Sequence, residues 1–330
     1  MSLAALDIAF DATCRDRRWR FAPVAGPDVA RCVVGRSREE AAGLLPRVYN
    51  LCGGAHAVAA AAALGLPEPC RDRLSERLRD HAVAVFAEWP ALFGGAPDRA
   101  ALRQLAGTAE DHLALRRHVL GDDVAASELD LARATPAEFG KWLDRAASPT
   151  ARLMRRLQDT LHPDWGRVEL DRPDMADVVA ALEDGTPRVA RETTAADGWR
   201  GAPLIRDLLA REGMSLFVRL LARLLDLLAG LAGNAGPAPD RRPPPGIGFA
   251  YAARGLLAHR ARVEDGVVVD YRILAPSAWN LAPDGLLARM LAALPTNDET
   301  SRLARIAVAA VNPCVPVRLS FERGERRGDA

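Results

Sequence analysis

A leucine-rich segment, Leu216 to Leu228, constrains the fold of this chain more than any other stretch of it. Large apolar residues recur there at helical spacing: Leu216, Phe217, Leu220, Leu221, Leu224, Leu225 and Leu228. A membrane span is excluded because about 20 largely uncharged residues are needed to cross a bilayer, whereas Arg219, Arg223 and Asp226 interrupt this segment. We therefore predict a core helix with a polar edge and no membrane insertion.

Helical patterns also dominate much of the remaining sequence. Helical periodicity covers Arg71 to Phe86, and Pro90 is expected to break it. A further amphipathic stretch runs from Ala100 to Leu120, and the small side chains of Ala57 to Leu64 allow close helix packing. These segments indicate a mainly helical protein.

The expected β structure is small. The segment Leu256 to Leu274 contains two strand-like runs around the turn Glu264-Asp265-Gly266, which predicts a β-hairpin. Alternation in Leu3 to Phe10 favours another strand. Ser37 with Glu40 three residues later is the pattern of a capping box at a helix N-terminus. The predicted fold class is therefore mainly α with a small β element (α+β).

Length and charge exclude some classes of function. With 330 residues and 49% hydrophobic content, the chain can bury the core of one large domain or of two modest ones. The Pro-rich run Gly233 to Gly246 is predicted to be a stiff exposed linker or loop. A net charge of +1 offers no electrostatic attraction to nucleic acid or anionic lipid, so neither is expected as a partner.

The cysteines indicate a reducing compartment. They are scattered without a C-x-x-C pair, at Cys14, Cys32, Cys52, Cys70 and Cys314. No second ligand lies within zinc-finger spacing. Arg17 and Arg18 precede no long apolar run, so an export signal is not expected. An odd, irregular set of this kind is typical of reduced thiols, and we expect a cytoplasmic protein. Cys14, Cys32 and Cys70 are predicted to be packing residues.

Two short strings near opposite ends of the chain each contain one of the other cysteines. The first runs from Arg47 to His56 around Cys52, and the second runs from Asn312 to Val317 around Cys314. Thiolates are soft donors that suit iron and nickel better than carboxylates do. A lone buried cysteine, by contrast, usually serves as a small apolar residue.

The first string resembles R-x-C-G-x-C-x-x-x-H, a motif of nickel-iron hydrogenase large subunits. Tyr49 stands at its first cysteine, whereas Cys52 and His56 match its second cysteine and its histidine. In that family, four thiolates hold a nickel ion and an iron that carries cyanide and carbon monoxide. By the resemblance, Cys52 matches a thiolate that bridges the two metals.

The second string resembles D-P-C-x-x-C-x-x-H near the end of the same subunits. Cys314 matches the first cysteine and a terminal ligand, whereas Val317 and Ser320 replace the second cysteine and the histidine. Two thiolates cannot hold the dinuclear centre, so the resemblance implies one metal, iron, with no nickel. The predicted metal ligands are Cys52 and Cys314.

A third region matches in the expected order. Ala252 to His259 resembles E-A-P-R-G-x-L-x-H, and Pro276 to Asn280 resembles P-[ST]-T-W-N. In the family, the arginine and the Ser/Thr line the cavity around the diatomic ligands of the iron, and Arg254 and Ser277 match them. A guanidinium and a hydroxyl both offer donors to a cyanide nitrogen. Arg254, Ser277 and His56 are therefore predicted to contact the cofactor. Without the resemblance, we would interpret Arg254 as a surface charge and Ser277 as a turn residue.

The whole pattern is most similar to the HupK/HoxV type of hydrogenase maturation protein, a degenerate relative of the large subunit. It implies a single large-subunit-like domain over residues 1–330, a helical body plus a β-hairpin. The implied function is a non-enzymatic scaffold that holds or transfers an Fe(CN)2(CO) unit. The implied partners are the carrier chaperone and the iron-loaded scaffold of hydrogenase maturation, and the nickel-iron hydrogenase large subunit itself.

Two other functions fit the same pattern of kept and lost residues. One is a redox-active large subunit with an altered metal centre, and the other is a metal-free interaction module on the same fold. Hydrogenase activity is not expected, because the chain lacks the family's R-I-E-G-H segment with its proton-relaying glutamate. The short charged tail Phe321 to Ala330 is expected to remain on the mature protein.

Overall fold

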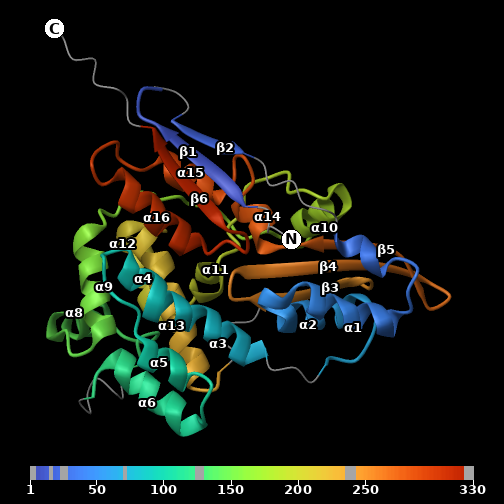
Figure 1. The fold of residues 1–330 in the computed structure, drawn as a ribbon, viewed down its shortest axis with the longest axis horizontal. Helices are drawn as coiled ribbons and strands as arrows, with labels where there is room; N and C mark the ends of the chain where they lie inside the picture. Colours follow the sequence, from blue (N-terminus) through green and yellow to red (C-terminus); the bar gives the residue numbers. More distant parts are fainter. Residues whose placement is uncertain are drawn as a thin grey trace.

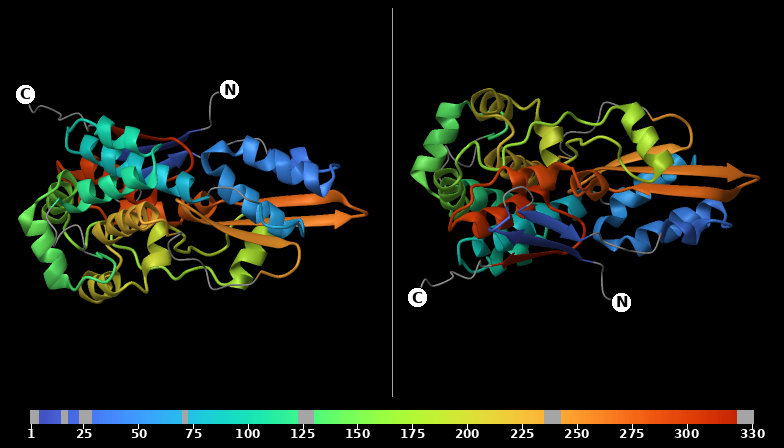
Figure 2. Two further views of the ribbon diagram at one scale, coloured as in Figure 1. Left: turned by 90° about the horizontal axis from the view of Figure 1, so that it is seen from below. Right: turned by 90° about the horizontal axis from the view of Figure 1, so that it is seen from above.

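The computed structural model describes residues 5–14, 18–22, 29–69, 73–122, 130–234 and 243–322. Helices form most of the molecule, and two small sheets lie at its edges (Figure 1). Helices α1, α2 and α10 lie against the sheet β3–β5, whereas most of the other helices from α3 to α13 form a bundle beside it (Figures 1 and 2). The predicted fold class, mainly α with a small β element, is confirmed.

Helices occur along most of the described chain. The α-helices are α1 (Arg38–Val48), α2 (Gly53–Ala63), α3 (Arg73–Val83), α4 (Trp89–Ala91), α5 (Arg99–Gln104), α6 (Ala109–Leu120), α8 (Pro136–Arg145), α9 (Pro149–Thr160), α10 (Met175–Asp184), α11 (Ala195–Trp199), α12 (Pro203–Glu212), α13 (Leu216–Leu231), α14 (Pro276–Asn280), α15 (Leu286–Ala292) and α16 (Thr300–Val311). Two short 3-10 turns, η1 (Val29–Val33) and η2 (Asn50–Cys52), and one π-helical turn, η3 (Ala84–Glu88), complete the set within the described residues.

Each sheet has three strands. The first, in the order β2 (Trp19–Ala22), β1 (Leu6–Asp11) and β6 (Val317–Glu322), pairs β1 antiparallel with β2 and parallel with β6. The second is an antiparallel meander of β3 (Ile247–Ala252), β4 (Gly255–Glu264) and β5 (Val267–Leu274). The pairing of β1 with β6 joins segments from the two ends of the chain.

The predicted β-hairpin and capping box are both confirmed. β4 and β5 are joined by a turn in which Asp265 and Gly266 have positive φ angles of 49° and 79°, as tight hairpin turns require. The Ser37 side chain accepts a hydrogen bond from the backbone N–H of Glu40, and the Glu40 side chain reaches back to the Ser37 backbone. The strand expected at Leu3 to Phe10 is β1; residues 1–4 lie outside the described part of the chain.

Close packing joins α2 to the second sheet. A Cβ atom on Gly248 of β3 would lie 2.0 Å from the backbone oxygen of Ala59 on α2, so only glycine fits there. Ala55 and Ala59 are buried in a cluster with Leu257 of β4. The alanine-rich run therefore packs as predicted, with small side chains that let the helix approach the strands.

The leucine-rich segment is the buried core helix that its pattern predicts. It forms α13, and its leucines belong to the largest apolar cluster of the described residues. The predicted polar edge is also buried: Arg219 is 0% exposed and Arg223 is 1% exposed. None of the helices that the structure describes is long and apolar enough to cross a membrane.

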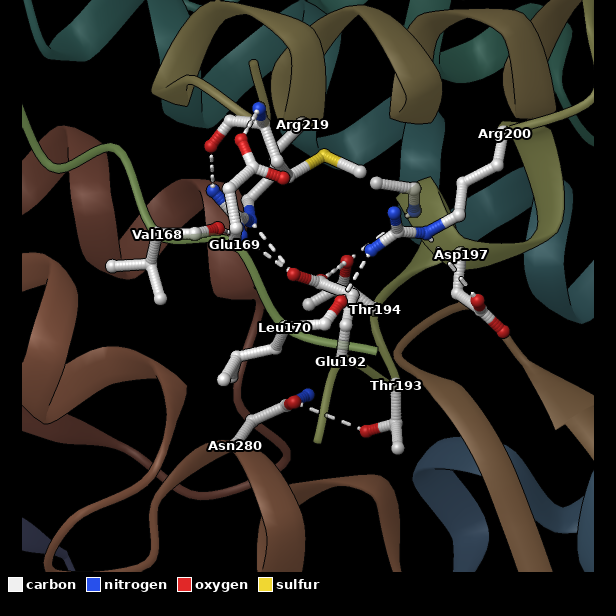
Figure 3. A network of polar contacts seen from close by, with 12 residues as sticks. Val168, Glu169, Leu170, Glu192, Thr193, Thr194, Asp197, Arg200, Arg219 and Asn280 are labelled. Atoms are coloured by element: carbon white, nitrogen blue, oxygen red, sulfur yellow. Dashed lines mark hydrogen bonds and ion pairs between the residues drawn. The ribbon is translucent and has the colours of Figure 1, made fainter. Parts of the chain in front are cut away.

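Buried polar partners explain how this edge lies inside the protein (Figure 3). Arg219 Nη2 lies 2.5 Å from an oxygen of Glu192, whose side chain is also fully buried. Arg219 also donates to the backbone oxygens of Met214 and Val168, and Thr194 donates to Glu192. A buried charge is tolerated when it is paired and hydrogen-bonded in this way.

The helical path that begins with α3 ends at Pro90, as predicted, within one residue. The π turn and α4 carry it on as far as Ala91, and no helix follows until α5. The amphipathic stretch Ala100 to Leu120 is divided into two helices, α5 and α6, because Thr108 and Asp111 form a capping box that starts a new helix.

The prediction for the remaining cysteines holds only in part. Cys32 is exposed on η1, so its assignment as a packing residue was wrong. Cys14 is half-buried just after β1. Cys70 lies outside the described residues, as do residues 235–242 of the predicted linker and residues 323–330 of the charged tail.

Candidate functional site

Cys52 lies where η2 meets α2, beside a small cavity. The residues around the cavity come from η2, α2, α3 and the end of β3: Leu51, Cys52, Ala55, Glu76, Arg77, Asp80, Tyr251, Ala252, Ala253 and Arg254. Its volume is about 10 Å3, close to the space that one water molecule needs. The cavity is therefore lined by a thiol, carboxylates and guanidiniums but has almost no free space.

Cys314 lies in the loop between α16 and β6, and two predicted site residues hold this loop. The backbone N–H of Cys314 donates to Ser277 Oγ at 2.9 Å. Arg254 Nε donates to the backbone oxygen of Pro313 over a longer distance of 3.4 Å. Arg254 also lines the cavity beside Cys52, so its side chain connects this cavity to the loop that carries Cys314. The structure thus brings Cys52, Cys314, Arg254 and Ser277 together.

Asp80 on α3 connects several parts of this site. Its carboxylate lies 2.6 Å from Arg254 Nη2 and 3.6 Å from Arg223 Nη2, and it accepts a hydrogen bond from Asn312 Nδ2 at 2.8 Å. Burial acts to raise the pKa of Asp80, but the guanidiniums of Arg254 and Arg223 outweigh it and hold the pKa below its usual value. Asp80 is therefore an anion that pairs with Arg254 and also anchors the loop before Cys314.

The backbone around Arg254 is held by a close contact at the next residue. Gly255 has a φ angle of +115°, and a Cβ atom there would lie 1.3 Å from the backbone oxygen of Thr193. Leu256 N donates to that same oxygen at 3.2 Å. Only glycine permits this approach, so the Thr193 segment sets the direction of the turn that carries Arg254.

The same segment also supports the helix that carries Ser277. Thr193 Oγ1 donates to Asn280 Oδ1 at 3.0 Å and lies 3.4 Å from the backbone oxygen of Pro276, both on α14 (Figure 3). Thr193 directly follows Glu192, the buried partner of Arg219. These buried polar contacts therefore fix the backbone segments that carry two of the predicted site residues, Arg254 and Ser277.

The environment of Cys52 favours its neutral thiol. Burial raises the pKa of the Cys52 thiol to about 12, although the nearby Arg254 guanidinium acts in the opposite direction. Cys314, Glu76 and Asp80 add to the rise because each places negative charge near the sulfur. A metal that binds Cys52 would have to displace the thiol proton.

His56 lies on α2 within a different set of contacts. Its Nδ1 is 2.9 Å from His259 Nε2, and His259 Nδ1 is 2.7 Å from the Tyr271 hydroxyl. The ring of Tyr49 stacks on His56 with centroids 4.3 Å apart. Burial lowers the pKa of His56 to about 4, so the ring is neutral at pH 7. These contacts link His56 to β4 and β5, and its role toward a cofactor stays a prediction.

Sequence reasoning missed Glu76, Asp80 and Asn312. Glu76 accepts a hydrogen bond from Gly54 N at 2.8 Å, at the start of α2 beside Cys52. A carboxylate at a helix N-terminus is favourable, but the two residues are 22 positions apart, so no local pattern indicates the contact. Asn312 ends α16 with a φ angle of 54°. Its position directly before Pro313 is the feature of the sequence that could have indicated this helix end.

The donor set fits an iron unit that brings ligands of its own. Two cysteines can supply soft thiolates, and Arg254 and Ser277 can supply hydrogen-bond donors. Within the part of the chain that the structure describes, no three His, Cys, Asp or Glu side chains gather to hold a metal ion. The cavity would have to widen to admit more than one water-sized group.

Comparisons with known proteins identify the relatives of this chain. A family model described as nickel-dependent hydrogenase matches residues 233–294. The chain is 33% identical over 290 residues to the hydrogenase expression/formation protein HupK of Rhodobacter capsulatus, with 88% of each protein covered. It is 29% identical over 386 residues to the hydrogenase expression/formation protein HoxV of Cupriavidus necator, covering 94% of this chain and 97% of that protein.

Solved structures show the same fold. The Ni-Fe-Se hydrogenase from D. vulgaris Hildenborough superimposes with a TM-score of 0.58 at 15% identity, covering 89% of this chain and 92% of that one. At that identity the likeness establishes the fold alone, which is that of a hydrogenase large subunit. With the sequence identity to HupK over most of both proteins, it follows that the chain belongs to the HupK/HoxV family of hydrogenase expression/formation proteins.

Proposed function

We propose that this protein holds an Fe(CN)2(CO) unit as cargo and passes it to the large subunit of a nickel-iron hydrogenase. Family membership assigns the protein a role in hydrogenase maturation. The proposal that the cargo is an Fe(CN)2(CO) unit rests on one observation. Four residues from distant parts of the chain lie near one another: Cys52, Cys314, Arg254 and Ser277. Two soft donors and two hydrogen-bond donors are the groups that such a unit needs.

Each side chain has a separate role in this proposal. Cys52 and Cys314 bind the iron as thiolates after loss of their protons. An iron that already carries three diatomic ligands needs few donors from the protein, so two thiolates are sufficient to retain it. Arg254 and Ser277 donate hydrogen bonds to the cyanide nitrogens. Ser277 Oγ already accepts from the Cys314 N–H, so its own hydroxyl hydrogen remains for an external acceptor.

Loading requires a change at Arg254. Its Nη2 pairs with Asp80 at 2.6 Å, and the cavity has room for about one water molecule. The cargo can therefore enter only when the loop before Cys314 moves away from Arg254. The Arg254 guanidinium then gives up its contact with Asp80 or Pro313 and donates a hydrogen bond to a cyanide nitrogen. Because Pro313 accepts from Arg254 and Asn312 donates to Asp80, the loop and the guanidinium would move together.

The partners follow from this cargo. A carrier chaperone and an iron-loaded scaffold would deliver the unit, and the hydrogenase large subunit would receive it, all in the cytoplasm. The protein itself would perform no hydrogen chemistry. A metal-free interaction module on the same fold is a second candidate, and the small volume of the cavity favours it.

Infrared spectroscopy of the protein purified from a maturation-competent host tests the proposal. We expect cyanide and carbonyl bands, bound iron, and nickel well below one ion per chain. Cys52→Ser and Cys314→Ser should each weaken the bands, because each removes one of two thiolates. Cys32→Ser serves as the matched control, since Cys32 is exposed on η1.

Each alternative predicts a different result. Equal band intensity in the wild type and in both ligand variants would refute the thiolate assignment. Absence of bands from wild-type protein in an active host would favour the metal-free module. Bound nickel with hydrogen turnover would favour a redox-active large subunit.

A further inference from the structure

A second and much larger pocket lies on the helical side of the molecule. Its volume is about 450 Å3, within the usual range for ligand pockets. The π turn η3 and α4 form one wall, α9 forms the opposite wall, and α6 contributes a third side. None of its lining residues lines the cysteine cavity, so a role for this pocket is independent of the proposed function.

The floor of this pocket is apolar and well supported. Phe86, Phe93 and Leu153 line it, and Phe86 is buried against the main core. The Phe86 backbone oxygen accepts a hydrogen bond from Asp98 N at 2.7 Å, which ties the π turn to the loop before α5. Single π turns inside helices are frequent at functional sites.

The rim carries positive charge that carboxylates of the described chain do not neutralise. Arg152 and Arg156 are exposed and stand four residues apart on α9. Arg152 donates to the Ala146 backbone oxygen at 2.9 Å, and the Arg156 guanidinium lies 4.4 Å from the centroid of the Phe93 ring. Like charges at this spacing are mildly destabilising in a helix.

Two neighbouring residues, Arg155 and Asp98, differ from Arg152 and Arg156 because each already has an oppositely charged or hydrogen-bonding partner. Arg155, on the same helix, is paired with both Asp144 and Asp159. The acidic residue of the pocket, Asp98, is already engaged by His118 at 2.7 Å and accepts from Ala101 N at 3.0 Å. The pocket therefore combines an apolar floor with two exposed guanidiniums that can bind an external anion.

We infer that this pocket docks a segment of a partner protein in which an apolar side chain stands beside carboxylates. The apolar side chain would cover Phe93 and Leu153, which are only half-buried, and the carboxylates would pair with Arg152 and Arg156, whose planar guanidiniums suit bidentate binding. Because both arginines are exposed at an open rim, a segment of a larger chain fits better than an enclosed small molecule.

A labelled peptide tests this inference on the full-length protein. The probe is fluorescein-labelled Asp-Glu-Phe-Leu-Glu-Asp, and fluorescence polarisation gives its Kd. We expect Arg156→Ala to raise the Kd about five-fold and the Arg152→Ala, Arg156→Ala pair about ten-fold or more. Arg155→Ala removes the same charge from the same helix and should change the Kd by less than about two-fold.

Peptide chemistry separates the parts of the site. Asp-Glu-Ser-Ser-Glu-Asp keeps the charge but lacks the apolar anchor, and it should bind about ten-fold more weakly. Thermal unfolding of each variant checks that it is folded, which is expected because Arg152 and Arg156 are exposed.

Four results would overturn the inference. They are no binding of the Phe-Leu peptide by the wild type, an equal loss with Arg155→Ala, equal affinity for the Ser-Ser peptide, and full displacement by millimolar inorganic phosphate. The first shows that no such segment docks, the second and third show general charge attraction, and the last shows a small-anion site.

Discussion

At the scale of single residues, Arg254 is the predicted site residue whose side chain and backbone are both held by close contacts. Its side chain is only 12% exposed, it pairs with Asp80, and its backbone is set by the close approach of Gly255 to Thr193. A guanidinium held in this way is preorganised, so little conformational entropy is lost when it exchanges one acceptor for another. The function of Arg254 can therefore be tested by a substitution that changes the geometry of its hydrogen-bond donors but keeps its positive charge.

Arg254→Lys should shift the cyanide stretching bands of the loaded protein while the chain stays folded. Lysine keeps the positive charge but loses the planar fork of donors. A hydrogen bond to a charged group contributes about 1.5 to 3 kcal/mol, so retention of the iron unit should weaken about ten-fold or more. Infrared spectra and iron content measure both effects, with Arg318→Lys at an exposed ion pair as the control. Unchanged bands and unchanged hydrogenase maturation would mean that the pocket is vestigial.

Gly255→Ala should destabilise the protein by about 3 kcal/mol or more, because the new Cβ atom would collide with the Thr193 backbone oxygen. Gly266→Ala is the matched control: its φ angle is +79°, but no atom lies within 4 Å of the new Cβ. There the cost should be about 1 kcal/mol, from backbone strain alone. Urea denaturation measures both values, and equal losses would show that the contact with Thr193 yields at little cost.

At the scale of elements, α13 is unusual because its buried face carries charge. Arg219 pairs with Glu192, and Asp226 accepts from Arg77 Nη2 at 2.6 and 2.7 Å and from Trp199 Nε1 at 2.8 Å. These pairs join α13 to α3, to α11 and to the segment that supports Arg254 and Ser277. Pairs of this kind give the helix defined neighbours, while their net contribution to stability is small.

Breaking one such pair should nevertheless be costly. Glu192→Gln removes the charge opposite Arg219 and leaves a buried guanidinium uncompensated, which costs about 3 to 5 kcal/mol. Asp184→Asn removes one partner of the exposed Arg188 pair and should leave the free energy of unfolding nearly unchanged, because solvent screens an exposed ion pair. The free energy of unfolding in urea distinguishes the two; a loss below about 1 kcal/mol for Glu192→Gln would mean that water or a neighbouring group replaces the carboxylate.

At the scale of the whole molecule, the two ends of the chain are joined. β1 pairs in parallel with β6, in a register that runs from Leu6 opposite Val317 to Asp11 opposite Glu322. β6 directly follows the Cys314 loop, so the position of that loop depends on a strand pair between the first and last parts of the chain. Stability of the whole fold is therefore expected to affect the geometry of the site.

Acid should destabilise the whole fold before most carboxylates titrate. His56 has an ordinary pKa near 6.5 when unfolded and, because of burial, about 4 when folded. Between these values the unfolded chain binds more protons, so stability is full above pH 6.5 and falls as the pH drops toward 4. This histidine alone accounts for about 3 kcal/mol, and burial lowers the pKa of His259 as well, in the same direction.

Urea denaturation at pH 7 and pH 5 measures the part of this loss that develops by pH 5, which is about 2 kcal/mol for His56. Equal stability of the wild type at the two pH values would contradict the prediction, because it would require His56 and His259 to titrate in the folded protein as they do in the unfolded chain.

Local signals in the sequence determined much of the fold of this protein. Helical periodicity, the Ser37 capping box and the turn at Asp265 and Gly266 each depend on residues within a few positions of one another, and the structure has all three. The order of the motifs also located Cys52 and Cys314, although their function as ligands remains a proposal.

Tertiary structure alone decided which partners the buried charges have. Asp80 meets Arg254, Glu192 meets Arg219, and Glu76 caps α2, and each contact joins segments that are far apart in the sequence. Such contacts depend on packing and on the need to pair every buried charge, and no local propensity encodes either. For the same reason the sequence could indicate that α13 has a polar edge, but only the folded chain shows that this edge is buried and supports the site.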